Sequence, residues 1–122
     1  MTIKMKFKHL FLSVIIFVSC VDNSDKITVC NTINPLEELV WLKEIKIGFE
    51  QSSFFSKKKI IQYTYQNKSV FLIDICNNCA DNLTAVYNCT GNVICEFGGI
   101  AGVNTCPDFD KYATNEILLW EN

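Results

Sequence analysis

The segment KIIQYTYQNKSVFLIDIC, residues 59–76, decides the fold that the sequence predicts. In its first part Ile61, Tyr63 and Tyr65 alternate with polar residues, which is typical of a strand with one buried face. Asn67 and Lys68 then predict a tight turn. The following run, residues 70–76, is more continuously apolar, as in a central strand. The segment therefore predicts two neighbouring antiparallel strands.

The sequence that follows extends this sheet. Residues 83–89 and 93–97 predict two further strands, joined by a hairpin turn in which Gly91 can adopt a positive φ. Beyond them, residues 107–113 predict a short helix and residues 117–120 a last strand. The result is an antiparallel meander with short connections.

Glycines follow the fourth predicted strand, in the stretch Gly-Gly-Ile-Ala-Gly at residues 98–102. Glycine-rich loops can bind phosphate, but this one lacks the Lys-Ser or Lys-Thr pair of a P-loop and a long following helix. We therefore expect a closely packed backbone crossing here.

A helix is predicted before the sheet. Asn34 can cap it, Pro35 suits its first position, and Glu37 completes a capping box. Apolar residues at helical spacing extend it over residues 35–49, and Trp41 beside them is expected in the core. The predicted fold class is α+β: one N-terminal helix packed on a small antiparallel β-meander and stapled by disulfides.

The N-terminus has the pattern of an export signal. Basic residues precede an apolar run at residues 10–18, which is shorter than the roughly 20 residues of a spanning helix. Ser19 and Cys20 follow this run, as a small residue and a cysteine do in a bacterial lipobox. We expect cleavage after residue 19 and lipid, such as palmitate, on Cys20, which would hold the protein on a membrane. An ordinary secretory signal is the alternative.

This signal divides the chain into three parts. Residues 1–19 are the predicted lipoprotein signal peptide, residues 20–30 a polar tether, and residues 31–122 a single small domain. The only histidine, His9, lies in the first part, so the predicted mature chain contains neither histidine nor arginine.

These absences exclude several function classes. The formal net charge is −2, and Lys57, Lys58 and Lys59, which we interpret as a solvated strand entrance, are the only cluster of cations in the predicted domain. Nucleic acid is therefore not an expected partner. Without histidine, hydrolysis by a Ser-His-Asp triad is not available. We expect no enzymatic activity, no cofactor and no metal.

Carboxylate chemistry stays formally open. Glycosidase-like catalysis needs only two carboxylates, for which this chain offers four candidates outside any recognisable motif. An oxygen-rich cluster around residues 74–82 could also supply calcium ligands, although aspartate and asparagine are ordinary turn residues. The candidate carboxylates are Asp74, Glu96, Asp108 and Asp110.

The remaining cysteines form an even set, which in an exported chain indicates disulfides. The sequence does not choose among the pairings, but Cys89 and Cys95 flank a predicted hairpin turn and should lie close to each other or to common partners. The cysteines are Cys30, Cys76, Cys79, Cys89, Cys95 and Cys106.

Two other interpretations compete with structural disulfides. Cys76 and Cys79 form a C-x-x-C pair directly after an apolar strand, as in thioredoxin-like enzymes, although turn residues follow instead of a helix. A zinc site could use four thiolates, but the chain has no second C-x-x-C pair and no histidine in its predicted domain.

Several stretches of the chain resemble a family of small, uncharacterised lipoproteins of Bacteroidota. The resemblance rests on residues 34–37, 41–44, 87–95, 97–102 and 104–109. It implies a cell-envelope address and a cysteine-bearing α+β domain, and it carries no activity.

The sequence therefore favours a non-catalytic binding or structural module of the cell envelope. Its lipid would attach it to the outer membrane, on the periplasmic or the surface face, and its partner would be another envelope protein or ligand. Candidate contact surfaces are the aromatic pairs Tyr63 and Tyr65, and Phe54 and Phe55. The alternatives are an inhibitor of an exported hydrolase and a thiol-disulfide oxidoreductase that uses Cys76 and Cys79.

Overall fold

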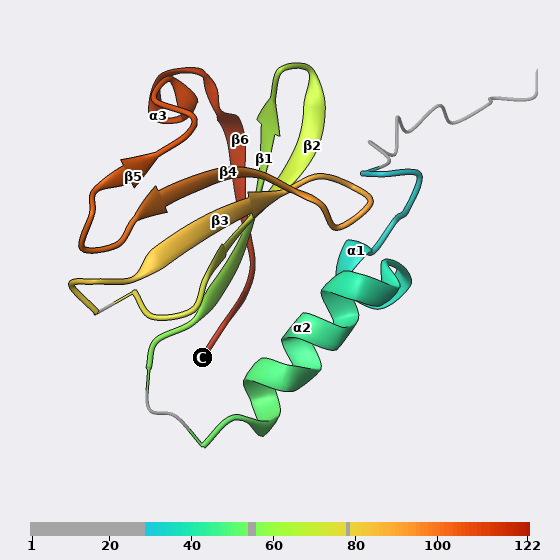
Figure 1. The fold of residues 1–122 in the computed structure, drawn as a ribbon. Helices are drawn as coiled ribbons and strands as arrows, with labels where there is room; N and C mark the ends of the chain where they lie inside the picture. Colours follow the sequence, from blue (N-terminus) through green and yellow to red (C-terminus); the bar gives the residue numbers. More distant parts are fainter. Residues whose placement is uncertain (1–28, 54–55, 78) are drawn as a thin grey trace, which may run out of the picture.

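The computed structural model describes residues 29–53, 56–77 and 79–122. The predicted signal peptide, most of the predicted tether and Cys20 lie outside these residues, as do Phe54 and Phe55. Figure 1 shows a helical segment against a curled antiparallel sheet, which confirms the predicted α+β class. The elements are α1 (Pro35–Glu38), α2 (Val40–Gln51), β1 (Lys59–Tyr65), β2 (Lys68–Asp74), β3 (Leu83–Tyr87), β4 (Val93–Gly98), β5 (Val103–Asn104), α3 (Phe109–Tyr112) and β6 (Thr114–Glu121).

The sheet has the strand order β5-β4-β3-β2-β1-β6. Strands β1 to β5 follow one another as an antiparallel meander, and the chain then passes through α3 to place β6 beside β1 at the opposite edge. The four predicted meander strands and the last strand are confirmed. The two-residue β5 was not predicted, and β6 is longer than the predicted strand at residues 117–120.

The hairpin between β1 and β2 turns at Gln66 and Asn67, one residue earlier than predicted. Both residues have positive φ, 51° and 61°, and Tyr65 pairs with Lys68. Two consecutive positive φ angles are characteristic of a type I′ turn, whose twist matches that of the flanking strands. Lys68 is therefore the first residue of β2 rather than a turn residue.

The predicted helix is divided into α1 and α2. Leu39 has an extended backbone, with ψ at 105°, and separates them. The predicted side-chain cap at Asn34 is wrong, because its side chain forms no capping hydrogen bond. Instead the Glu38 carboxylate accepts hydrogen bonds from the backbone N–H groups of Ile33 and Asn34, at 2.8 and 2.7 Å. Glu38, not Glu37, therefore holds the start of α1.

The first hydrophobic core lies between α2 and one face of the sheet. Leu42 of α2 is fully buried, in a cluster with Ile60, Phe71 and Ile73 of the sheet. Val29 belongs to the same cluster, so the chain before α1 is already part of the core.

Trp41 extends this core, as predicted. Its ring meets Phe71 edge-on and stacks on Tyr87, with centroids 5.7 and 5.6 Å apart. Its Nε1–H donates a hydrogen bond to the Cys89 carbonyl oxygen at 3.0 Å. The indole therefore ties α2 to the end of β3.

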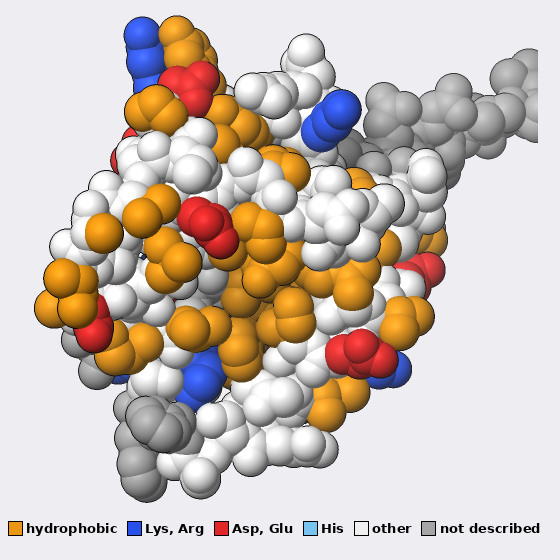
Figure 2. Space-filling model, in the orientation of Figure 1, with side chains coloured by type: hydrophobic (Ala, Val, Ile, Leu, Met, Phe, Trp, Pro, Cys, Tyr) orange, Lys and Arg blue, Asp and Glu red, His pale blue; other side chains and the backbone are white. Residues whose placement is uncertain are grey.

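Helix α2 covers only part of its face of the sheet. Leu83 on β3 and Val93 on β4 are exposed. Tyr87, on the same face of β3 as Leu83, packs with the first core instead. Figure 2 shows apolar side chains gathered in the middle of this view, between α2 and strands β3 and β4.

The second core lies on the opposite face, under α3. Phe109 is buried against Tyr65, Val70, Val86 and Cys95. Each face of the sheet is therefore covered by a different part of the chain.

The glycines at the end of β4 and just after it form the tight β4–β5 hairpin. Gly98 has φ of 93°, and a Cβ atom there would lie 2.5 Å from the backbone oxygen of Asn82. The N–H of Gly99 donates to the same oxygen at 3.0 Å. The predicted close backbone crossing is confirmed, because only glycine fits this approach at this φ.

Candidate functional site

All six cysteines of the described chain form disulfides. Cys89 and Cys95 do not pair with each other, because Cys89 joins the segment before α1 and Cys95 joins the segment after β5. The pairs are Cys30–Cys89, Cys76–Cys79 and Cys95–Cys106. The predicted disulfide staples are confirmed, and the cysteines are not available as zinc ligands.

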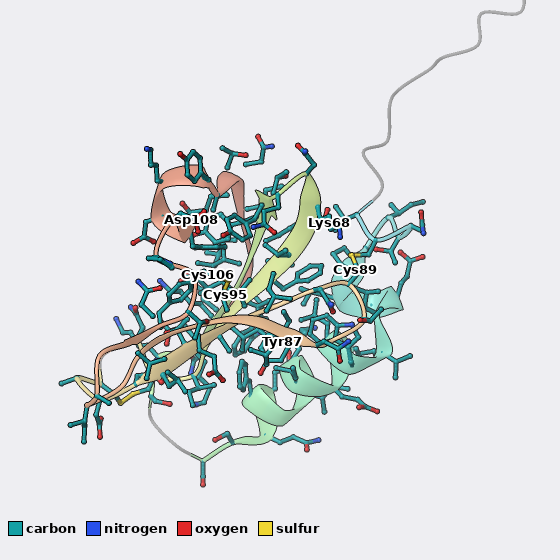
Figure 3. The ribbon with its side chains drawn as sticks, turned by 45° about the horizontal axis from the view of Figure 1, so that its top comes forward. Lys68, Tyr87, Cys89, Cys95, Cys106 and Asp108 are labelled. Atoms are coloured by element: carbon teal, nitrogen blue, oxygen red, sulfur yellow. A yellow bond between two sulfur atoms is a disulfide. The ribbon has the colours of Figure 1, made fainter. Side chains whose placement is uncertain are left out.

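Two of these disulfides line a groove of about 510 Å³ at one end of the sheet. The groove lies where the β1–β2 turn, the β3–β4 turn and the segment around Cys30 meet. Figure 3 shows Cys95 and Cys106 beside each other at the centre, with Lys68 and Cys89 to one side of them. The lining residues are Cys30, Tyr65, Gln66, Lys68, Ser69, Val70, Asn88, Cys89, Thr90, Ile94, Cys95 and Cys106.

The wall formed by the β3–β4 turn is held rigidly. The Asn88 side-chain oxygen accepts hydrogen bonds from the N–H of Thr90, the hydroxyl of Thr90 and the N–H of Asn92, at 3.0, 2.8 and 2.9 Å. The Cys30–Cys89 disulfide anchors the same turn to the segment before α1. A ligand in the groove would therefore meet a preformed surface, which lowers the ordering cost of binding.

The groove combines apolar surface with one positive charge. Ile94 and the half-buried cysteines Cys30, Cys89 and Cys106 supply the apolar surface, whereas Val70 and Cys95 are buried behind it. Among the described lining residues, Lys68 is the only one with a formal charge, and it is exposed. The groove can therefore accept an apolar group that carries a negative charge.

Tyr65 lines the groove only partly, because it is 4% exposed. Its hydroxyl donates a hydrogen bond to Asp108 Oδ1 at 2.7 Å, and its ring lies 5.0 Å from that of Phe109. The hydrogen bond to Asp108, with a smaller effect from burial, raises the pKa of Tyr65. The prediction that Tyr65 belongs to an exposed aromatic surface is wrong, because α3 covers it.

Tyr63 is half-buried beside Tyr65. Its ring meets Phe109 edge-on, with centroids 5.4 Å apart. Burial, followed by the nearby Glu116 carboxylate, raises the pKa of Tyr63. Tyr63 is therefore mainly a packing residue of the second core.

The Cys76–Cys79 disulfide lies away from the groove, in the loop after β2. Asp74 Oδ1 organises this loop, accepting hydrogen bonds from the Cys76 N–H at 3.1 Å and the Asn82 side-chain amide at 2.6 Å. This use of Asp74 is that of a turn residue. Within the described residues, no group of three or more His, Cys, Asp and Glu side chains could hold a metal ion.

The three consecutive lysines lie beside this loop. Lys57, Lys58 and Lys59 line a second pocket of about 220 Å³ with Asn77 and residues 121–122. Lys58 is only 6% exposed, and its Nζ donates to the Ser56 carbonyl oxygen at 3.3 Å. The interpretation of the three lysines as a solvated strand entrance is therefore wrong at Lys58, whose backbone N–H and carbonyl oxygen both form hydrogen bonds with Asn122 at the C-terminus.

A family of domains of unknown function, DUF6970, matches residues 49–122 of the chain. The chain belongs to the DUF6970 family. The DUF6970 match contains every strand of the sheet, and it contains the whole groove lining except Cys30. No curated protein and no solved structure matches the chain. Among the helices of the described residues, none is long and apolar enough to cross a membrane.

No pattern in the sequence indicated the groove itself. Gln66 and Lys68 belong to the β1–β2 hairpin and Asn88 to the β3–β4 turn, and only the pairing of β2 with β3 brings them together. The groove cysteines were singled out as staples, and their common position at one end of the sheet follows from pairings that the sequence left open.

Proposed function

We propose that this DUF6970 protein is a lipid-anchored, non-catalytic binding module of the bacterial cell envelope. The observation that carries the proposal is the groove, in which two disulfides and a rigid turn surround apolar surface beside Lys68. A preformed concave surface with few convergent polar groups is the usual form of a binding site.

Three features support the proposed address. The N-terminal sequence has the export and lipobox pattern, and the chain resembles small lipoproteins of Bacteroidota. The three disulfides suit an oxidising compartment outside the cytoplasm. Lipid on Cys20 would place the domain close to the membrane surface, where its partners would be other envelope components.

The chemistry of the groove defines the partner. Lys68 favours a carboxylate or another anion, and the exposed side chain of Ile94 favours an adjacent apolar group. We propose that the ligand is a segment of another envelope protein that carries an acidic group next to an apolar side chain. Burial of that side chain would supply affinity, and the lysine would set its orientation.

The test is affinity capture with the full-length, tagged protein expressed in its native host. Lys68→Glu reverses the charge of the groove, and Lys111→Glu is the matched control, because Lys111 is exposed on α3 and does not line the groove. We expect the partner to be captured by the wild type and by the control but lost with Lys68→Glu. Capture of the same proteins by all three would contradict the proposed site.

The identity of the captured partner separates the binding module from the inhibitor alternative. If the partner is a peptidase or a muramidase, its activity is measured with and without the protein. If the wild-type protein abolishes that activity and Lys68→Glu does not, the binding is inhibitory.

The anchor is tested separately by metabolic labelling with palmitate. The wild type should incorporate the label and sediment with membranes, whereas Cys20→Ala should do neither. A wild type that carries no label and sediments to the same extent as Cys20→Ala would contradict lipid anchoring. The groove proposal would be unaffected by that result.

A further inference from the structure

The Cys76–Cys79 disulfide differs from the other two in its exposure. Cys79 is the only exposed cysteine among the six that the structure describes, and its partner Cys76 is 8% exposed. In contrast, Cys95 is 1% exposed and its partner is half-buried, as are both cysteines of the pair Cys30–Cys89. Thiol–disulfide exchange requires a thiolate to reach one sulfur of the bond. Access therefore favours attack on Cys79.

The position of this disulfide in the chain also sets it apart. Its cysteines are 3 residues apart in sequence, against 59 for Cys30–Cys89 and 11 for Cys95–Cys106. A cross-link that closes a short loop restrains the unfolded chain least. Cys76–Cys79 should therefore stabilise the fold less than the other two disulfides, so stabilisation explains its presence less well.

The described residues on both sides of this disulfide are also held by hydrogen bonds. The N–H of Asn77 donates to the Lys57 carbonyl oxygen at 2.8 Å, and the N–H of Cys79 donates to the Cys76 carbonyl oxygen at 3.1 Å. Asp74 fixes Cys76 and Asn82 on either side of the pair. The two thiols would therefore stay near each other after reduction, ready to re-form the bond.

We propose that Cys76–Cys79 is an exchange-active disulfide that accepts electrons from a dithiol of another protein, while the other two pairs are structural. This exchange reaction would be a second property of the protein, separate from the non-catalytic binding proposed for the groove at the other two disulfides. The feature that carries it is the combination of an exposed Cys79, a buried Cys76 and residues on both sides held by hydrogen bonds.

The reaction has two displacement steps. A thiolate of the partner attacks Sγ of Cys79, the Cys76–Cys79 bond breaks, a mixed disulfide forms on Cys79, and Cys76 leaves as a thiolate. The second thiolate of the partner then attacks the partner's first sulfur in the mixed disulfide, and Cys79 leaves as a thiolate. The partner gains a disulfide, and two electrons and the two thiol protons pass to Cys76 and Cys79.

The site differs from a thioredoxin-like centre. Residues 80–81 form a turn, and the described residues after the pair lead into β3 instead of a helix, so no helix N-terminus stabilises a thiolate here. We therefore expect the oxidised form to be the resting state, with exchange set by access to Cys79.

The test measures the reduction of each disulfide in the native full-length protein. The protein is treated with dithiothreitol without denaturant, quenched by alkylation at successive times, and mapped by mass spectrometry. We expect Cys76–Cys79 to open at least about tenfold faster than the other pairs, with unchanged tryptophan fluorescence. Simultaneous opening of all three, or Cys76–Cys79 opening last, would overturn the proposal.

Single variants identify the attacked sulfur. Cys76→Ala leaves the exposed Cys79 as a free thiol, and Cys79→Ala leaves the buried Cys76. We expect the first variant to form a mixed disulfide with dithionitrobenzoate roughly tenfold faster than the second, because thiol reactivity follows access. Equal rates would refute the assignment of Cys79, and the wild-type reduction experiment decides the proposal if either variant does not fold.

Discussion

Removal of the Cys30–Cys89 disulfide should destabilise the protein more than removal of either other pair. The double change Cys30→Ala and Cys89→Ala deletes the cross-link without leaving a free thiol. This pair spans 59 residues of sequence and joins the segment before α1 to the end of β3. Its loss lets a long stretch of the unfolded chain, including α2 and three strands, explore many more conformations.

The magnitude follows from the length of each closed loop. Chain entropy gives about 4 kcal/mol for Cys30–Cys89, about 3 kcal/mol for Cys95–Cys106 and about 2 kcal/mol for Cys76–Cys79. The whole stability of a small domain is about 5–15 kcal/mol. The first change should therefore remove a large share of the stability of the protein, and the last should be tolerated.

Urea unfolding monitored by tryptophan fluorescence measures these costs, because Trp41 and Trp120 both pack with the first core. The slope of the free energy of unfolding against urea should also rise when Cys30–Cys89 is removed, since a less restrained unfolded chain exposes more surface. If removal of Cys76–Cys79 costs as much as removal of Cys30–Cys89, loop length does not set the contribution of these bonds and the reasoning is wrong.

Three further changes test local geometry. Gly98→Ala should cost about 2–3 kcal/mol, against about 1 kcal/mol for Gly102→Ala, because both have positive φ but only the first meets a backbone oxygen; thermal unfolding of the two variants compares them. Gly48→Ala should stabilise the protein by about 1 kcal/mol, since a Cβ there meets no atom within 4 Å in α2, and a lower melting temperature would count against this. Tyr65→Phe should lower the stability at neutral pH through the lost hydrogen bond to Asp108. Because the fold raises the pKa of Tyr65, the wild type should lose stability as the pH rises above about 10. Urea titrations at neutral pH and above pH 10 should show a smaller loss of stability for Tyr65→Phe than for the wild type.

The parts of the fold with a clear side-chain period could be predicted from the sequence. Alternation in β1 and the apolar run in β2 gave both strands, since a period of two has few other structural explanations. The two-residue β5 is too short to show any period. The break at Leu39 was not predictable, because leucine favours helices and only its extended backbone in the fold separates α1 from α2.

The candidate site was less predictable than the fold. An even set of cysteines indicated disulfides, but their pairing depends on the return of the chain through α3 and on the docking of the segment before α1. Tyr65 shows the same limit, since its place in the alternating pattern could not reveal that Phe109, distant in sequence, covers it. The groove depends on these long-range contacts, and no local pattern encodes it.

Strand β6 affects how readily molecules of this protein associate with one another at high concentration. It is a long edge strand, but its pairing with β1 contains two register shifts, and Asn115 has a positive φ of 54°. Glu116 and Glu121 add negative charge along it. Irregular pairing and charge on an edge oppose the addition of a strand from a second molecule. This protein should therefore resist self-association through its β6 edge even when crowded on a surface.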